Sequence, residues 1–395
     1  MAGDCGRGRE HSVHRRAPVD PRTCSGRRLS PDLADRRSQP RTTQPQQQIS
    51  VARNQRRRSR VELTNGIRVG IRLPNSGPFA GPREIFDLAR HIEANGFDHV
   101  WVHDHISWTA DRRGHFSTGA IDAQQAADPN FFESVTTAAA VGAVLERTQV
   151  GIAGLALPLR DPRILAKQLA TIDALLGRRR LILAVGVGSQ PADFDTMGVP
   201  FKRRGRITND YLAALRQLLR FDGPLDVQSD ALTFSSQPFW PRGDGVEIWV
   251  AARSGPGLTR AAILADGWLT AGMPVEEYAE ATRHWHGALE AVGLAPQDRV
   301  AAYETFACID ESYDGAVELA RPTLEAMYGD VQTGLSKALV GDPTAFSERL
   351  VELSGLGAEV FELRLLGTSM EQLMRQVEVL ADAVLPKVRP LKAGT

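Results

Sequence analysis

The sequence predicts an α/β protein of the (β/α)8 class, a TIM barrel with insertions, preceded by a disordered N-terminal extension. From residue 67 onward, eight short segments typical of strands alternate with segments that have helical periodicity. The fourth strand-like segment, residues 181–187, is apolar throughout, which is typical of a parallel strand buried on both faces. Residues 67–390 are therefore expected to form one barrel domain.

The expected strands end at turn residues or lead into helical segments. The first alternates around Val69 and Ile71 and ends at Pro74. The full set is residues 67–73, 98–102, 150–157, 181–187, 246–251, 267–270, 300–306 and 360–366. An open doubly wound sheet is the alternative, but it predicts a glycine-rich turn after the first strand, where residues 74–78 read Pro-Asn-Ser-Gly-Pro.

The helical segments carry capping signals. After Pro82, apolar residues recur at positions i, i+3, i+4 and i+7, and Gly96 ends the segment. Asp161 and Pro162 suit the N-cap and first position of a helix that runs to Gly177. The other expected helices are residues 131–146, 205–219, 258–265 and 370–384, and a small hairpin is expected within residues 221–244.

Residues 1–66 differ from the rest of the chain in composition. They contain 15 arginines, no lysine and six acidic residues, and they have almost no apolar clusters. Such a segment buries too little apolar surface to offset its ordering entropy, so we expect it to be disordered. Because the net charge of the full chain is zero, the remainder carries −9 and lacks the basic face that a nucleic-acid partner requires.

Other compositional features narrow the class further. No apolar run approaches the roughly 18 residues of a membrane span, so no membrane partner is expected. The three cysteines, Cys5, Cys24 and Cys308, form no disulfide framework, so we expect a cytoplasmic protein.

The most informative motif is Asp104-His105, which directly follows the second expected strand. Chemistry in a parallel barrel gathers at the carboxyl ends of the strands. An imidazole titrates near neutral pH, a neighbouring carboxylate can orient it, and Trp108 can stack on a flat ligand. We therefore take His105 as the catalytic group and Asp104 as its orienting residue, with Trp108 in the substrate pocket. The alternative is that Asp104 caps the next segment and His105 is a loop histidine.

A metal site is a second interpretation of the same motif. His103 and His105 form an H-x-H pair, as in metal-dependent barrel hydrolases. A zinc site needs three or four protein ligands, and none of the other histidines falls at a later strand end. We expect no metal.

Two further loops have the residue types of a cofactor site. Gly186 and Gly188 follow the fourth strand, where missing side chains let a flat ring approach the backbone. Arg253, Ser254 and Gly255 follow the fifth strand and precede a helix, whose N-terminal N–H groups suit a phosphate. Each loop is also compatible with an ordinary turn.

These motifs occur in an order that resembles the luciferase-like monooxygenase superfamily of flavin- and deazaflavin-dependent barrels, over residues 67–386. The motifs are Gly-Phe-Asp-His-Val-Trp at 96–101 leading into Asp104-His105, Arg-Asp-Pro at 160–162 with Leu-Ala-Lys at 165–167 and Ile-Asp at 172–173, Gly-Val-Gly at 186–188, Arg-Gly-Arg at 204–206 with Asp210, and Arg-Ala-Ala at 260–262 with Ala-Asp-Gly-Trp at 265–268.

The fifth-strand loop resembles the branch that uses coenzyme F420, an 8-hydroxy-5-deazaflavin. Flavin-type members often have Gly-Gly after this strand, and here the pair is Ala251-Ala252. The resemblance implies that backbone groups around Arg253, Ser254 and Gly255 hold the cofactor phosphate. It also implies a non-prolyl cis peptide behind the deazaflavin ring, at Ala153-Gly154.

The resemblance gives His105 the place of a catalytic histidine in the sugar-phosphate dehydrogenases of this branch. Those enzymes have Glu after Gly-x-Gly, whereas this chain has Ser189, so a different substrate is expected and the proton-transfer partner is unidentified. Residues 109–128 are expected to form a polar lid. Arg160 could anchor a phosphate or pair with Asp161, and we expect the structural role.

The expected function is F420-dependent hydride transfer to or from a small organic substrate. The alternatives are an FMN-dependent monooxygenase fed by a separate flavin reductase, and a non-catalytic flavin-binding barrel. The resemblance also favours a homodimer.

Overall fold

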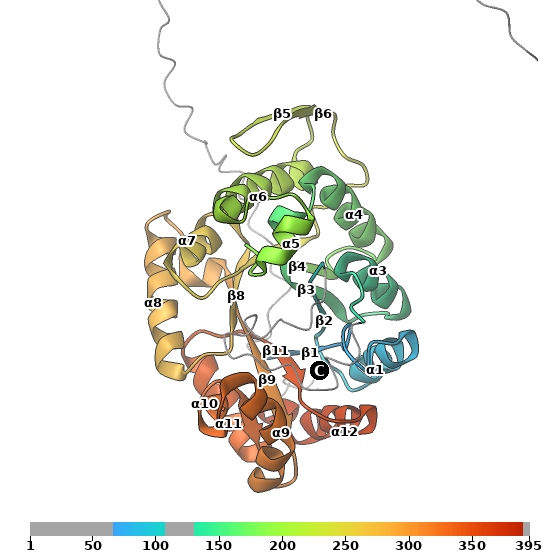
Figure 1. Ribbon diagram of the computed structural model, residues 1–395, viewed down its shortest axis with the longest axis vertical. Helices are drawn as coiled ribbons and strands as arrows, with labels where there is room; N and C mark the ends of the chain where they lie inside the picture. The colour runs from blue at the N-terminus through green and yellow to red at the C-terminus, as the bar shows by residue number, and fades with distance from the viewer. Residues whose placement is uncertain (1–65, 107–129, 390–395) are drawn as a thin grey trace, which may run out of the picture. The chain divides into compact units, whose positions relative to one another are not determined.

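The computed structural model describes residues 66–106 and 130–389, which include a closed barrel of eight parallel strands. Helices surround the strands on the outside (Figure 1). In ring order the strands are β1 (Arg68–Arg72), β2 (His99–His103), β3 (Gln149–Ala156), β4 (Leu181–Gly186), β7 (Glu247–Ala251), β8 (Gly267–Ala271), β9 (Val300–Ile309) and β11 (Val360–Leu365). The pairing of β11 with β1 and of β8 with β9 closes the ring, so the fold class and all eight predicted strands are confirmed.

The helices follow the strands with two additions to the basic pattern. Their bounds are α1 Pro82–Ala94, α3 Ser134–Val144, α4 Pro162–Leu175, α5 Pro191–Thr196, α6 Arg204–Arg220, α7 Gly255–Leu264, α8 Val275–Glu290, α9 Tyr313–Tyr328, α10 Val331–Leu335, α11 Pro343–Gly355, α12 Met370–Val379 and α13 Leu385–Val388. One addition is the hairpin of β5 (Leu225–Gln228) and β6 (Thr233–Ser236). The other lies between β9 and β11, where α10 and the short strand β10 (Leu339–Gly341) add to the helices.

Local sequence signals explain where these helices begin and end. In α1, Pro82 occupies the first turn and the four periodic apolar residues are all buried. Gly96 follows α1 with φ of +78°, a conformation that glycine adopts without strain. In α4, the Asp161 carboxylate accepts a hydrogen bond from the Arg163 N–H, as expected of an N-cap.

Large aromatic side chains fill the barrel interior beneath the strand ends. Trp101 of β2 and Trp249 of β7 are fully buried, and their ring centroids are 5.6 Å apart. Gly70 and Gly151 on the strands beside β2 leave the space that the Trp101 indole occupies, because a Cβ at Gly151 would lie 2.0 Å from the ring. The interior is therefore a packed core, and open space begins only above it.

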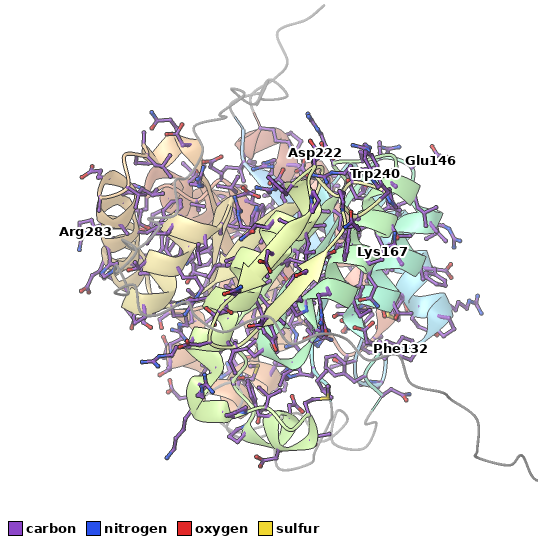
Figure 2. All side chains as sticks on the ribbon, turned by 90° about the horizontal axis from the view of Figure 1, so that it is seen from above. Phe132, Glu146, Lys167, Asp222, Trp240 and Arg283 are labelled. Carbon is purple, nitrogen blue, oxygen red and sulfur yellow. The ribbon has the colours of Figure 1, made fainter. Side chains whose placement is uncertain are left out.

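The hairpin is attached to the outer surface through α4. The Lys167 ammonium donates a hydrogen bond to the carbonyl of Trp240, which follows the hairpin. Figure 2 shows both residues near the hairpin. The predicted hairpin within residues 221–244 is confirmed, and it lies outside the ring of strands.

Several expectations concern parts of the chain outside the described residues. They are the disorder of the extension up to residue 65, the role of Trp108 and the lid at residues 109–128. In the part that is described, no helix is long and apolar enough to cross a membrane.

The packing of Trp101 against Gly151 predicts a large penalty for Gly151→Ala. The added methyl group would overlap the indole within a close-packed layer, so we expect the free energy of unfolding to fall by about 1–3 kcal/mol. Urea unfolding followed by circular dichroism measures this change. Gly287→Ala is the matched control, since its Cβ meets nothing within 4 Å on α8 and should leave stability equal or slightly higher. Equal stability of the two variants would contradict the packing argument.

Candidate active site

A cavity of about 290 Å³ opens at the carboxyl ends of the barrel strands. Its volume is close to the lower limit of small-molecule sites, roughly 300 Å³. Seven of the residues singled out from the sequence line it, namely Asp104, His105, Ala153, Gly154, Gly188, Ser189 and Arg253. The lining does not include Gly186, Ser254 or Gly255, which are chain neighbours of lining residues or one residue further away.

His105 reaches the cavity directly after β2 and is mostly buried, with 11% of its side chain exposed. Its imidazole lies edge-on to Phe131, at 5.2 Å between ring centroids, and to His103, at 6.3 Å. Its Nδ1 is 3.9 Å from Oδ2 of Asp193, a carboxylate on α5. Within the described part of the chain, Asp193 is thus the acid that the structure brings to the His105 ring.

Asp104 does not orient His105, and that prediction is wrong. Both of its oxygens are used elsewhere, because Oδ1 accepts from the Ser134 hydroxyl at 2.8 Å and Oδ2 from the Ala156 N–H at 3.0 Å. The Arg160 guanidinium also binds both oxygens, at 2.5 and 2.8 Å. Asp104 is buried, so the guanidinium offsets its charge and the pair ties β2 to β3.

The expected role of Arg160 is confirmed as structural, but its partners differ from the expected one. It binds Asp104 and, at 3.1 Å, Glu133, whereas Asp161 binds Arg163. The two carboxylates outweigh the effect of burial and raise the pKa of Arg160. Sequence proximity favoured Asp161, but Asp161 is the N-cap of α4 and its oxygens face the first turn of that helix.

Gly154 gives the cavity a wall without a side chain. The register of β3 against β4 shifts between Ala153 and Leu155, so Gly154 is an extra residue with φ of +78°. A Cβ at this position would meet nothing within 4 Å. The prediction of a cis peptide at Ala153-Gly154 is wrong. Within the described ranges, the cis peptide bond is Trp240-Pro241. At Gly154 the chain turns through the bulge instead.

Gly188 is required for a different reason. It has φ of +77°, and a Cβ would lie 2.7 Å from the buried ring of Phe194. Gly188 therefore lets α5 pack closely on the end of β4, which fixes the position of the residues beside Phe194.

The loop after β7 leads into the N-terminus of α7. Ser254 is the N-cap in an extended conformation, and its side chain makes no capping hydrogen bond. Arg253 lines the cavity, and its guanidinium is 3.8 Å from Glu277, an exposed pair of small energetic weight. The N-terminal N–H groups of α7 and the Arg253 side chain are a suitable environment for an anion.

Sequence reasoning missed a buried charged cluster at the cavity wall. The Arg72 guanidinium at the end of β1 bonds to Glu304 of β9 at 2.6 Å and to Glu362 of β11 at 2.5 Å. Arg72 and Glu304 line the cavity, while Glu362 is fully buried. The available signal was a charged residue within each of three apolar strand segments, which is unusual for strands buried on both faces.

Two carboxylates share one guanidinium in this cluster, which favours the protonated form of Glu362. Burial raises the pKa of Glu362 to about 8, because the attraction of Arg72 is partly cancelled by repulsion from Glu304. Its second oxygen, Oε2, is buried and has no hydrogen-bond partner among the described residues, so nothing there stabilises a negative charge. Burial opposes the charge of Arg72, but the two carboxylates outweigh it and raise its pKa.

The H-x-H pair has other contacts. Nε2 of His103 is 3.0 Å from the hydroxyl of Ser76, and no group of three or more potential metal-binding side chains occurs in residues 66–106 and 130–389.

The model of the luciferase-like monooxygenase family matches residues 67–375, more than half of the chain. This chain therefore belongs to the luciferase-like monooxygenase family.

One relative is the F420-dependent glucose-6-phosphate dehydrogenase of Rhodococcus erythropolis, 29% identical over 211 residues, which are 51% of this chain and 56% of that protein. The chain spans 56–66% of the length of the curated relatives that it matches.

Solved structures agree with the barrel fold. An F420-dependent secondary alcohol dehydrogenase in complex with an F420–acetone adduct has a TM-score of 0.69 and 17% identity, covering 82% of this chain and 99% of that one. A type II Baeyer-Villiger monooxygenase from Pseudomonas putida, in complex with FMN, has a TM-score of 0.63 and 14% identity over the same shares. With sequence identities of 17% and 14%, the similarity to these two structures shows the shared fold alone.

The raised pKa of Glu362 predicts a specific pH dependence of stability. The folded state keeps a proton that the unfolded state loses above pH 4.5, so this contribution is complete below that pH and is lost as the pH rises through about 8. Relative to Glu362→Gln, the wild-type free energy of unfolding should fall by about 2–4 kcal/mol between pH 5 and 8.

Urea unfolding at both pH values tests this expectation. Glu348→Gln on the exposed face of α11 is the matched control and should follow the wild type. If the curves of wild type and Glu362→Gln ran parallel, Glu362 would not carry the retained proton.

Proposed function

We propose that this chain is an F420-dependent oxidoreductase that passes hydride between the deazaflavin and a small organic alcohol, carbonyl or activated alkene. The observation that carries the proposal is the cavity in which His105 shares the lining with the exposed backbone of Gly154 and with Arg253. The F420-dependent dehydrogenase relative supports the choice of cofactor. Ala251-Ala252, in place of Gly-Gly, supports the same branch.

The residues present fit a flat ring with an anionic tail. The ring would rest on Gly154, where the backbone bulges and a side chain would project into open space. The phosphate would be held by the N–H groups at the start of α7 and by Arg253. Together these features provide one apolar and one anion-binding end for a single planar cofactor.

When bound, a deazaflavin supplies a carbon centre that gives or accepts hydride. The protein must then orient the substrate, exclude water and handle a proton. His105 is the group proposed to give or take the proton of the substrate oxygen or carbon. Leu159, Phe194 and Phe306 contribute apolar surface to the lining of the cavity.

An FMN-dependent monooxygenase is the second candidate, and the FMN-bound structural neighbour favours it. In that case a separate flavin reductase would be the partner. A barrel that binds flavin without turnover is the candidate of a different class. Because the three differ in cofactor and in turnover, binding and activity separate them.

Cofactor titration tests the proposal directly. We expect saturable binding of F420, followed by absorbance or fluorescence, and no saturable binding of FMN. Gly154→Ala should raise the Kd for F420 by about tenfold or more, because it places a methyl group where the ring would lie. Gly293→Ala is the control, since it has a similar φ of +75° and does not line the cavity. Tight binding of FMN without binding of F420 would refute the proposal.

The proton role of His105 gives a separate expectation. In a substrate screen with F420, His105→Gln should lower kcat by about 10²- to 10⁴-fold, the usual contribution of a positioned acid or base, and leave F420 affinity within a few fold. Steady-state kinetics and the cofactor titration measure the two effects. Unchanged turnover would remove His105 from the reaction, and loss of cofactor affinity would make it a binding residue.

A further inference from the structure

Asp193 is a buried carboxylate at the cavity that sequence reasoning did not single out. It has 4% of its surface exposed and lines the same cavity as His105. Its Oδ2 is 3.9 Å from Nδ1 of His105. An opposite charge within about 4–6 Å favours the charged form of an imidazole, and the effect is larger where water is excluded.

The position of Asp193 is fixed by its neighbour in the chain. Phe194 is fully buried and packs with Ala156 and Leu159 in a small apolar cluster. Its ring also contacts Phe201, with centroids 5.1 Å apart, and fits against Gly188. Because α5 is short, anchoring Phe194 also fixes Asp193 on the side that faces the cavity.

His105 also packs against two aromatic rings. Its ring lies at a right angle to that of Phe131, and His103, two residues earlier, lies edge-on to it. His103 in turn contacts the Ser76 hydroxyl through Nε2. The imidazole of His105 is therefore in contact with two aromatic rings as well as lying 3.9 Å from the Asp193 carboxylate.

Asp104, the acid that precedes His105 in the chain, is electrostatically compensated. The Arg160 guanidinium binds both carboxylate oxygens of Asp104. Its positive charge therefore offsets most of the effect of the Asp104 charge on His105. Among the described residues, Asp193 is an acid whose carboxylate lies 3.9 Å from the His105 ring. The remaining charged or titratable groups that line the cavity are Arg72, His103, Arg253, Glu304, Tyr328, Lys337 and Arg364.

We propose that Asp193 is the positioning residue of His105, which presents Nδ1 to this carboxylate and so stabilises the imidazolium form. This inference rests on the proposed function for its role in turnover. In the oxidation of an alcohol, the C–H hydride would go to the oxidised deazaflavin and the O–H proton to His105, leaving a carbonyl. Asp193 would stay ionised throughout and offset the positive charge that His105 gains. In the reduction of a carbonyl, the reduced deazaflavin would give the hydride and His105 would return the proton to the oxygen.

The pairing can be measured without cofactor or substrate. NMR titration of the histidine ring signals of the full chain reports the pH at which each of the nine histidines takes up its proton. His105→Gln identifies the signal of His105. We expect Asp193→Asn to lower the midpoint of the His105 titration by about 1 pH unit or more, because the facing charge is removed. Asp193→Glu should restore most of the difference.

Asp195→Asn is the matched control, because Asp195 lies on the same short helix but is exposed. It should leave the midpoint unchanged. An unchanged midpoint in Asp193→Asn, or an equal change in Asp195→Asn, would overturn the pairing. Should Asp193→Asn fail to fold, the wild-type titration still decides: a midpoint at or below about 6.5, the ordinary value for histidine, would also overturn it.

Turnover separates this inference from the proposed function. If F420 binds and a substrate is found, Asp193→Asn should shift the acid limb of the kcat/KM profile in the same direction as the NMR midpoint, and Asp193→Glu should reverse the shift. A shifted midpoint with no F420 binding would leave the Asp193–His105 pair in place and refute the proposed function. A shifted midpoint with an unshifted pH profile would overturn the role of Asp193 in the reaction.

Discussion

The buried guanidinium of Arg72 connects the strands at which the barrel closes. Arg72 belongs to β1, and its two carboxylate partners lie on β11 and β9, which follow it around the ring. Glu304 and Glu362 are register partners on neighbouring parallel strands, so their side chains point to the same side of the sheet. Removing one member of such a buried cluster leaves uncompensated charge, which typically costs about 3–5 kcal/mol. These three side chains therefore connect the strands at which the ring closes, and two of them also line the cavity wall.

Closure of the ring brings the carboxyl ends of the strands together. Four of these strands each lead to a different kind of group in the site. Strand β2 leads to His105, β3 supplies the bulge at Gly154, and the loop after β4 carries Ser189 and then Asp193. Strand β7 leads to Arg253 and the start of α7. The result is a cavity lined by a histidine, a buried carboxylate, a bare stretch of backbone and the Arg253 side chain. These are the requirements of a planar redox cofactor with a phosphate tail.

The sequence predicted the fold better than the contacts within the site. Strand order and the placement of His105 follow from local apolar patterning and from the rule that chemistry gathers at strand ends. The partner of Asp104 could not be derived in this way, because Arg160 lies 56 positions away and meets it only through the pairing of β2 with β3. Asp193 was missed for a related reason, since nothing local indicates that the face of a six-residue helix turns toward β2. The cluster of Arg72 did leave a signal, a charge within each of three apolar strands, but its meaning requires the ring.

We propose that one planar deazaflavin occupies the cavity formed by these strand ends. A crystal structure of the chain with F420 bound would test this placement. We expect the ring against Gly154, the phosphate at the start of α7 near Arg253, and His105 on the face where a substrate would lie. Electron density for F420 at any other surface, or a ring separated from His105 by more than a small substrate could span, would contradict it.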